Sequence, residues 1–187
     1  RRKGLLWFPT YAVDFRGRYT FKNSSDQPRD VQLAFPLVGE GTIYDGFQVS
    51  TPDGMEAPST ISSGCARWSA RFEPGASREF TIRYRSRGTS KWTYKLTDGT
   101  GEVHHFAMNL RTNFPNVDFP PGSVSPTRAQ RIGKTWSGHW TFERLVANAP
   151  IGLVLPERLN PGPLAARITF FAPVGLLFFF FVVAIFA

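Results

Sequence analysis

The sequence predicts a mainly β protein, an antiparallel β-sandwich followed by one C-terminal transmembrane α-helix. In the first part of the chain, apolar and polar residues alternate with a period of two, in short runs separated by turn-forming residues. The last stretch, residues 168–187 (ITFFAPVGLLFFFFVVAIFA), contains no charged side chain. The chain has 187 residues, so the part before the apolar stretch is long enough for one domain with its own core.

The first predicted strand, residues 10–21, places Val13, Phe15 and Tyr19 on one face and Asp14 and Arg16 on the other. The turn-forming segment NSSDQP follows, and we expect the next strand, residues 31–35, to pair with the first in an antiparallel manner. The same alternation predicts further strands at 43–49, 68–72, 80–84, 92–96, 104–110, 136–142 and 146–155. Short strands separated by frequent turns are typical of a sandwich.

Two proline-rich segments interrupt this pattern. Residues 113–126 (NFPNVDFPPGSVSP) show no strand period, and Phe114, Val117 and Phe119 would be costly to expose to water. This segment is therefore predicted to be a loop packed onto the sandwich. Residues 156–167 begin PERLNPGP, which predicts a stiff connector between a domain at 1–155 and a helix at 168–187.

The apolar stretch 168–187 matches the thickness of a bilayer, because 20 residues of α-helix span about 30 Å. Three other interpretations compete with a spanning helix in a larger membrane protein: a buried core helix, a cytosolic tail anchor, and a lipid-anchor signal that is removed. Pro173 and Gly175 favour a bundle of several helices, since neighbouring helices can satisfy the backbone groups that they free. We therefore expect a fragment of a larger membrane protein.

The formal net charge of +8 raises the question of an anionic partner. The candidate contact residues are Arg83, Arg85, Arg87 and Lys91, because the three arginines alternate outward along one predicted strand. Aromatic residues in this stretch fall on the opposite face, so base stacking and phosphate contacts would not share a surface, and nucleic-acid binding is not expected. Anionic lipid headgroups or envelope polymers suit such a face better.

The sequence offers little chemistry for an enzyme. His104 and His105 are adjacent on a predicted strand and point to opposite faces, so they cannot share a metal without a bulge, and His139 is isolated. Cys65 lacks any known nucleophile motif, and Asp118 in VDFPPG is typical of a turn cap. We predict no catalytic residue, no metal site and no cofactor.

Three segments together resemble the inner-membrane CreD family of bacterial cell-envelope integrity proteins. They are YAVDFRGRYTFKNSSDQPRDVQLAFPL, TNFPNVDFPPGSVSPT and LNPGPLAARITFFAPVGLLFFFF. The resemblance implies a β-rich domain outside the cytoplasmic membrane, the first helix of a following bundle, and a link to envelope stress and the response to β-lactams. It assigns no catalytic residue.

The expected function is therefore a non-catalytic interaction or sensing domain on the periplasmic side of the inner membrane. Its expected partners are the lipid bilayer and other envelope proteins or anionic envelope polymers. The alternative is a hydrolase or carbohydrate-active domain that acts on the envelope. The two differ in the surface they require, because an enzyme needs a concave pocket with convergent polar groups, whereas an interaction domain can use a flat face or an edge strand.

Overall fold

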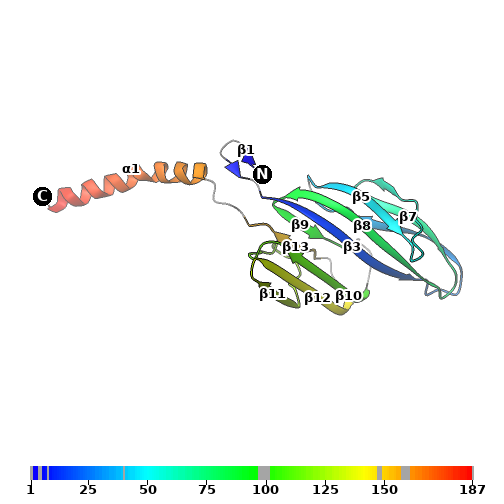
Figure 1. The fold of residues 1–187 in the computed structure, drawn as a ribbon. Helices are drawn as coiled ribbons and strands as arrows, with labels where there is room; N and C mark the ends of the chain where they lie inside the picture. Colours follow the sequence, from blue (N-terminus) through cyan, green and yellow to red (C-terminus); the bar gives the residue numbers. More distant parts are fainter. Residues whose placement is uncertain are drawn as a thin grey trace. The chain divides into compact units, whose positions relative to one another are not determined.

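The protein is described by a computed structural model that covers residues 2–3, 6–7, 9–39, 41–96, 102–146, 149–156 and 161–186. It consists of antiparallel β-sheets and one C-terminal helix, as predicted (Figure 1). The chain divides into two compact units. One is the β domain, Thr10–Pro156, and the other comprises Arg1–Pro9 and Glu157–Ala187, with the two-residue strands β1 (Arg2–Lys3) and β2 (Leu6–Trp7) paired to each other.

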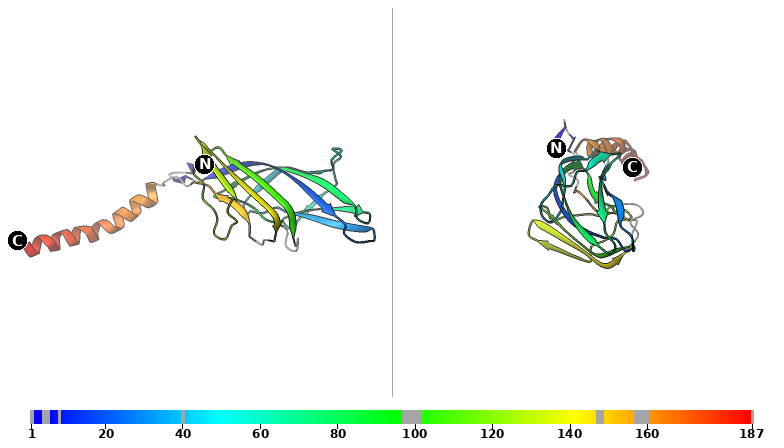
Figure 2. Two further views of the ribbon diagram at one scale, coloured as in Figure 1. Left: turned by 90° about the horizontal axis from the view of Figure 1, so that it is seen from below. Right: turned by 90° about the vertical axis from the view of Figure 1, so that its right-hand side faces the viewer.

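Two three-stranded sheets form the sandwich. One has the order β3 (Thr10–Lys22), β8 (Ser77–Thr89), β5 (Ile43–Ser50), and the other the order β4 (Arg29–Pro36), β7 (Cys65–Phe72), β6 (Thr60–Ser62). Aromatic rings from both sheets meet between them: Phe35 of β4 contacts Phe15 at 5.8 Å and Tyr84 at 6.0 Å, centroid to centroid. The end-on view in Figure 2 shows the strands on both sides of this core.

The alternation in β3 and β8 has the predicted orientation. In β3 the odd-numbered side chains, including Phe15 and Tyr19, are half-buried and pack against the core, and the even-numbered ones are exposed. In β8, Phe80, Ile82 and Tyr84 are buried. Burying such side chains contributes roughly 1.5–3 kcal/mol each, which makes this alternation the main determinant of the sheet faces.

The predicted pairing of residues 10–21 with 31–35 is wrong. β3 pairs with β8 over its whole length, from Thr10 opposite Thr89 to Lys22 opposite Ser77, and β4 pairs with β7 in the other sheet. The turn after β3 therefore crosses from one layer to the other. Asn23 stabilises this crossing: its side-chain amide donates to the carbonyl of Gln27 at 2.8 Å and its Oδ1 accepts from the N–H of Ser25 at 3.1 Å.

After β8 the chain changes direction at Ser90, whose φ of 64° lies in the left-handed region. The following strand, β9 (Lys91–Tyr94), pairs with β13 (Ile151–Val154). Tyr94 contacts the rings of Phe15 and Phe35, at 5.9 Å and 6.4 Å. The turn at Ser90 thus directs β9 against the aromatic core instead of continuing β8.

A third sheet has the order β10 (Val103–Thr112), β12 (Thr135–Leu145), β11 (Arg128–Ile132). The loop 113–126 packs on it, as predicted: Phe119 contacts the ring of Trp136 at 6.0 Å, and the indole N–H of Trp140 donates to the carbonyl of Val124 at 2.8 Å. Val117 and Phe119 both pack against the core. The proline-rich segment is thus part of the packed domain.

The beginning and the end of the β domain lie side by side. Thr10 is opposite Thr89 in the β3–β8 pair, and the N–H of Leu155 donates to the carbonyl of Ser90 at 2.8 Å. The chain therefore enters and leaves the domain at the same end of the β8 strand.

Helix α1 spans Pro161–Phe186 and so begins earlier than the predicted start at residue 168. Much of the predicted connector 156–167 is helical, and residues 157–160 of it lie outside the described residues. Pro161 and Pro163 are compatible with this start, because the first turn of a helix has no intrahelical use for their missing N–H groups. The segment Ala165–Phe186 has 22 residues and contains an 18-residue window with a mean hydropathy of 2.6, so the helix is long and apolar enough to cross a membrane.

Candidate functional site

The outward face of the β3–β8–β5 sheet carries the basic residues singled out in the sequence. Arg83, Arg85 and Arg87 alternate with the buried side chains of β8, so all three project from the same exposed face. The strands on both sides are in known register, which shows what lies next to each arginine. We call this surface the basic face.

The row of side chains at Arg85 is neutralised. Asp14 of β3 and Asp45 of β5 lie opposite Arg85 on its two sides, and the Arg85 guanidinium contacts the Asp45 carboxylate at 3.1 Å. All three side chains are exposed, so this arrangement contributes little to stability. It does remove Arg85 as a free cation, although the sequence had singled it out.

The next row is different, because Arg16 of β3 lies directly opposite Arg83. On the other side of Arg83 stands Gln48 of β5, a neutral amide. Neither guanidinium has an ion pair or hydrogen bond to another residue in the described part of the chain. Like charges directly opposite each other destabilise a sheet by a fraction of a kcal/mol to about 1 kcal/mol. A bound anion would turn this repulsion into attraction.

Arg87 and Lys91 complete the set that the sequence predicted. Arg87 lies between Ala12 and Ile43, again without a carboxylate in its row. Lys91 follows the turn at Ser90 and lies opposite Val154 in the β9–β13 pair, so it belongs to a different sheet from the three arginines. The basic face thus consists of Arg16, Arg83 and Arg87 as cations without carboxylate partners, with Arg85 paired and Lys91 elsewhere.

Sequence reasoning missed Arg16. Its outward orientation was predicted correctly, but its position opposite Arg83 depends on the pairing of β3 with β8, which was predicted incorrectly. The predicted runs, 10–21 and 80–84, differ in length, and only in the structure do β3 and β8 both have 13 residues, so the sequence offered no clear signal for this pairing.

The histidines do not come together. His105 has a φ of 52°, in the left-handed region, but the register of β10 and β12 is the same before and after it, from His104–Arg144 to Phe106–Phe142, so no extra residue is inserted. His104 approaches Glu102 at 3.7 Å and His105 approaches Glu143 at 3.4 Å, as separate pairs. Within the described ranges no group of three or more His, Cys, Asp or Glu side chains could hold a metal ion.

Cys65 and Asp118 also stand alone. Cys65 begins β7 as a half-buried free thiol. The Asp118 carboxylate accepts a hydrogen bond from the N–H of the next residue, Phe119, at 2.8 Å, and Asp118 forms an isolated bridge with Val154 instead of capping a turn. No hydrogen bond or ion pair in the described part of the chain links either residue to a histidine.

Comparisons of this chain with protein families, with curated proteins and with solved structures found no match.

Proposed function

We propose that this chain is a membrane-anchored interaction domain that binds an anionic polymer of the bacterial envelope through its basic face. In this proposal α1 spans the inner membrane, the β domain lies on the extracytoplasmic side, and the protein is a member of the CreD-like envelope proteins that it resembles. The domain binds and has no chemistry of its own. The observation that carries the proposal is the row Arg16–Arg83–Gln48, where two opposed cations have no carboxylate partner in the described residues.

The shape of the basic face favours a polymer or an extended surface. Its cations stand on adjacent strands of one sheet, and their side chains are exposed. Small molecules are usually held in concave sites, whereas repeated charges on a flat face match repeated charges on a partner. A polymer with closely spaced phosphates or carboxylates could contact Arg16, Arg83 and Arg87 at once.

The binding test uses the full chain in nanodiscs of zwitterionic phosphatidylcholine, titrated with fluorescein-labelled polyphosphate and followed by anisotropy. We expect the double variant Arg16→Gln/Arg83→Gln to bind at least about tenfold more weakly, with a shallower dependence on salt, because fewer counterions are released. The matched control is Arg71→Gln/Arg144→Gln, which removes two cations that already have carboxylate partners, Glu73 and Glu102.

Equal losses in the two double variants would show that only net charge matters, and would overturn the assignment of the site. The lipid bilayer itself is the rival ligand. If adding phosphatidylglycerol to the nanodiscs abolished polyphosphate binding by the unmodified chain, the basic face would be a contact with the protein's own membrane.

The location can be tested with one introduced cysteine, because the chain has a single native cysteine that can be replaced. In a Cys65→Ser background, Gln27→Cys places one thiol at an exposed turn of the β domain. We expect a membrane-impermeant maleimide to label this thiol in intact bacteria as fully as after lysis. Labelling only after lysis would favour a cytosolic, tail-anchored domain.

The absence of chemistry can be tested against the hydrolase alternative, with the following result expected of a non-catalytic domain. The separate variants Cys65→Ala, His105→Ala and Asp118→Asn should each leave an envelope-stress phenotype near that of the unmodified protein, provided that expression is normal. Loss of a true nucleophile or general base lowers rates by orders of magnitude. If one of these variants abolished the phenotype in a folded, membrane-inserted protein, the domain would have to be treated as an enzyme.

A further inference from the structure

Strand β7 extends beyond the strand that covers its edge. β6 pairs only with the first part of β7, from Ser62 opposite Cys65 to Thr60 opposite Arg67. β7 continues to Phe72, and along this second part the only described strand that pairs with it is β4, on its other side. Two more residues of β6 in the same register would place Pro58 opposite Ser69, and proline cannot donate a main-chain hydrogen bond.

The alternation of antiparallel pairing shows which main-chain groups are left open. The N–H of Leu37 donates to the carbonyl of Gly64 at 2.8 Å, one step beyond the Pro36–Cys65 pair. Hydrogen-bonded and non-hydrogen-bonded pairs alternate from there. Cys65, Arg67, Ser69 and Arg71 therefore direct their main-chain groups away from β4. β6 pairs with the first two, and no strand among the described residues pairs with those of Ser69 and Arg71.

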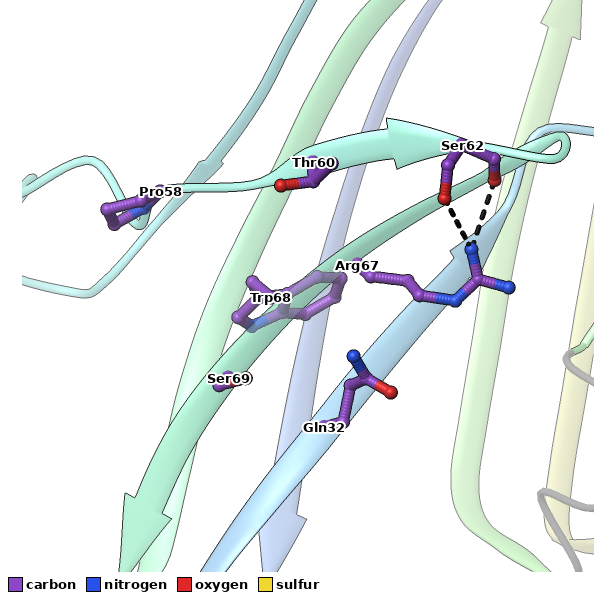
Figure 3. Close-up of a pocket in the computed structure, with 7 residues that line it drawn as sticks. All are labelled: Gln32, Pro58, Thr60, Ser62, Arg67, Trp68 and Ser69. Carbon is purple, nitrogen blue, oxygen red and sulfur yellow. Dashed lines mark hydrogen bonds between the residues drawn. The ribbon is translucent and has the colours of Figure 1, made fainter.

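A depression of about 510 Å³ lies where β6 stops and β7 continues (Figure 3). The polar residues Thr60, Ser69, Gln32 and Arg67 are among those that line it. Arg67 is held in place, because its Nη1 donates to the carbonyl of Ser62 at 3.0 Å and to the hydroxyl of Ser62 at 2.9 Å. Its remaining donors have no carboxylate partner in the described residues.

The same depression borders a buried donor without an acceptor. Trp68 is 3% exposed, and its indole nitrogen is buried with no hydrogen-bond partner. A buried, unpaired donor costs about 1–3 kcal/mol, so such groups call for an explanation. Here the donor belongs to a residue that lines the depression beside Ser69, with which no described strand pairs on the β6 side.

We infer that this edge of β7 binds an extended peptide segment of a partner protein that carries an acidic side chain. The peptide adds as a strand beside Ser69 and Arg71, and its carboxylate pairs with the oriented guanidinium of Arg67. This combination matches strand addition, in which main-chain hydrogen bonds supply affinity and side-chain pockets supply specificity. A second copy of the chain fits less well, because pairing centred on Ser69 would place Arg67 of each copy opposite Arg71 of the other.

The test uses the full chain, labelled with ¹⁵N, in detergent micelles. The probe is the peptide acetyl-Thr-Val-Glu-Val-Thr-amide, titrated while the main-chain signals of Ser69 and Arg71 and the indole signal of Trp68 are followed. We expect all three signals to shift together and the amide hydrogens of Ser69 and Arg71 to exchange more slowly. Replacing Glu by Gln in the peptide should weaken binding about tenfold for the unmodified chain, and by much less for Arg67→Gln.

The matched controls are two versions of the same peptide with N-methyl groups on alternate residues. In one version the methyl groups lie on the edge that faces β7, and in the other they lie on the outer edge. Methylation of the edge that faces β7 should abolish binding, whereas methylation of the outer edge should not. The Arg16→Gln/Arg83→Gln variant should bind the peptide normally, which separates this site from the basic face. Equal binding of both methylated peptides, absence of shifts at millimolar peptide, or self-association through β7 in place of peptide binding would each overturn the inference.

Discussion

The hydroxyl oxygen of Tyr19 lies 3.3 Å from that of Tyr94, and this hydrogen bond joins β3 to β9 inside the β domain. Tyr94 is buried, so its hydroxyl has little access to water as a substitute partner. We expect Tyr19→Phe and Tyr94→Phe each to lower the free energy of unfolding by about 1 kcal/mol, and the double variant to lose clearly less than the sum. Denaturant unfolding of the full chain in micelles measures all three values; strictly additive losses would contradict the coupling.

Alkaline pH should destabilise the domain through its tyrosines. Burial, with a smaller contribution from Tyr11, raises the pKa of Tyr44 from 10.0 to about 12, and burial also raises the pKa of Tyr84. Below pH 10 the folded and unfolded states both keep these protons, so the stability they support is fully present. Between pH 10 and 12 the unfolded state ionises first, and stability falls.

Tyr44→Phe therefore should flatten the decline of unfolding free energy between pH 10 and 12 and leave the plateau below pH 10 without slope. The measurement is a series of denaturant melts at fixed pH. If the free energy of unfolding of Tyr44→Phe fell as steeply between pH 10 and 12 as that of the unmodified chain, ionisation of Tyr44 would not contribute to the loss of stability.

Ser86 offers a stabilising substitution. Its side chain is 1% exposed, and its hydroxyl oxygen is buried without a hydrogen-bond partner. Ser86→Ala removes the unpaired hydroxyl and leaves nearly the same volume, so we expect a gain of about 1 kcal/mol in the free energy of unfolding. Thr81→Ala, a half-buried position on the opposite face of β8, is the control and should not stabilise. A loss of stability in Ser86→Ala would point to a partner that the structure does not contain.

Two neighbouring positions in β3 test the assignment of its faces. Phe15→Asp should unfold the domain, because Phe15 packs between Tyr84 at 4.6 Å and Tyr94 at 5.9 Å, and a carboxylate there would be unpaired. Arg16→Asp should instead be neutral or stabilising by up to about 1 kcal/mol, since it converts the opposed Arg16–Arg83 pair into one of opposite charge. Thermal melts that showed the reverse order would mean that the strand faces the other way.

The sequence pattern identified which side chains point into the core, but not which strands pair. Alternation in residues 10–21 placed Phe15 inside and Arg16 outside, because a strand with one wet face must alternate. It contains no information about the partner, and proximity in the chain wrongly suggested the strand at 31–35. Consequently, Arg83 was identified as a candidate contact, whereas its opposition to Arg16 was not foreseen.

The start of α1 and the edge site were missed for related reasons. Pro161 and Pro163 were read as barriers to a helix, although the first turn accepts proline. The open edge at Ser69 depends on where β6 ends in the register of β7, a property of pairing between strands that no single run displays. Charge and hydropathy patterns therefore predicted which side chains are exposed, whereas the strand pairing was needed to show which exposed residues are neighbours.

The chain enters and leaves the β domain beside Ser90, and this arrangement also determines how the domain would respond to mechanical load. Tension applied between Thr10 and Leu155 acts across the strands at one end of β8, where Thr10 faces Thr89 and Leu155 is bonded to Ser90. Such a load separates hydrogen bonds one after another, beginning at Leu155, instead of shearing a whole ladder at once. Both ladders open from this end, and β13, with four residues, has fewer pairs to lose than the 13-residue β3, so β13 would detach first and the domain would begin to yield at Ser90.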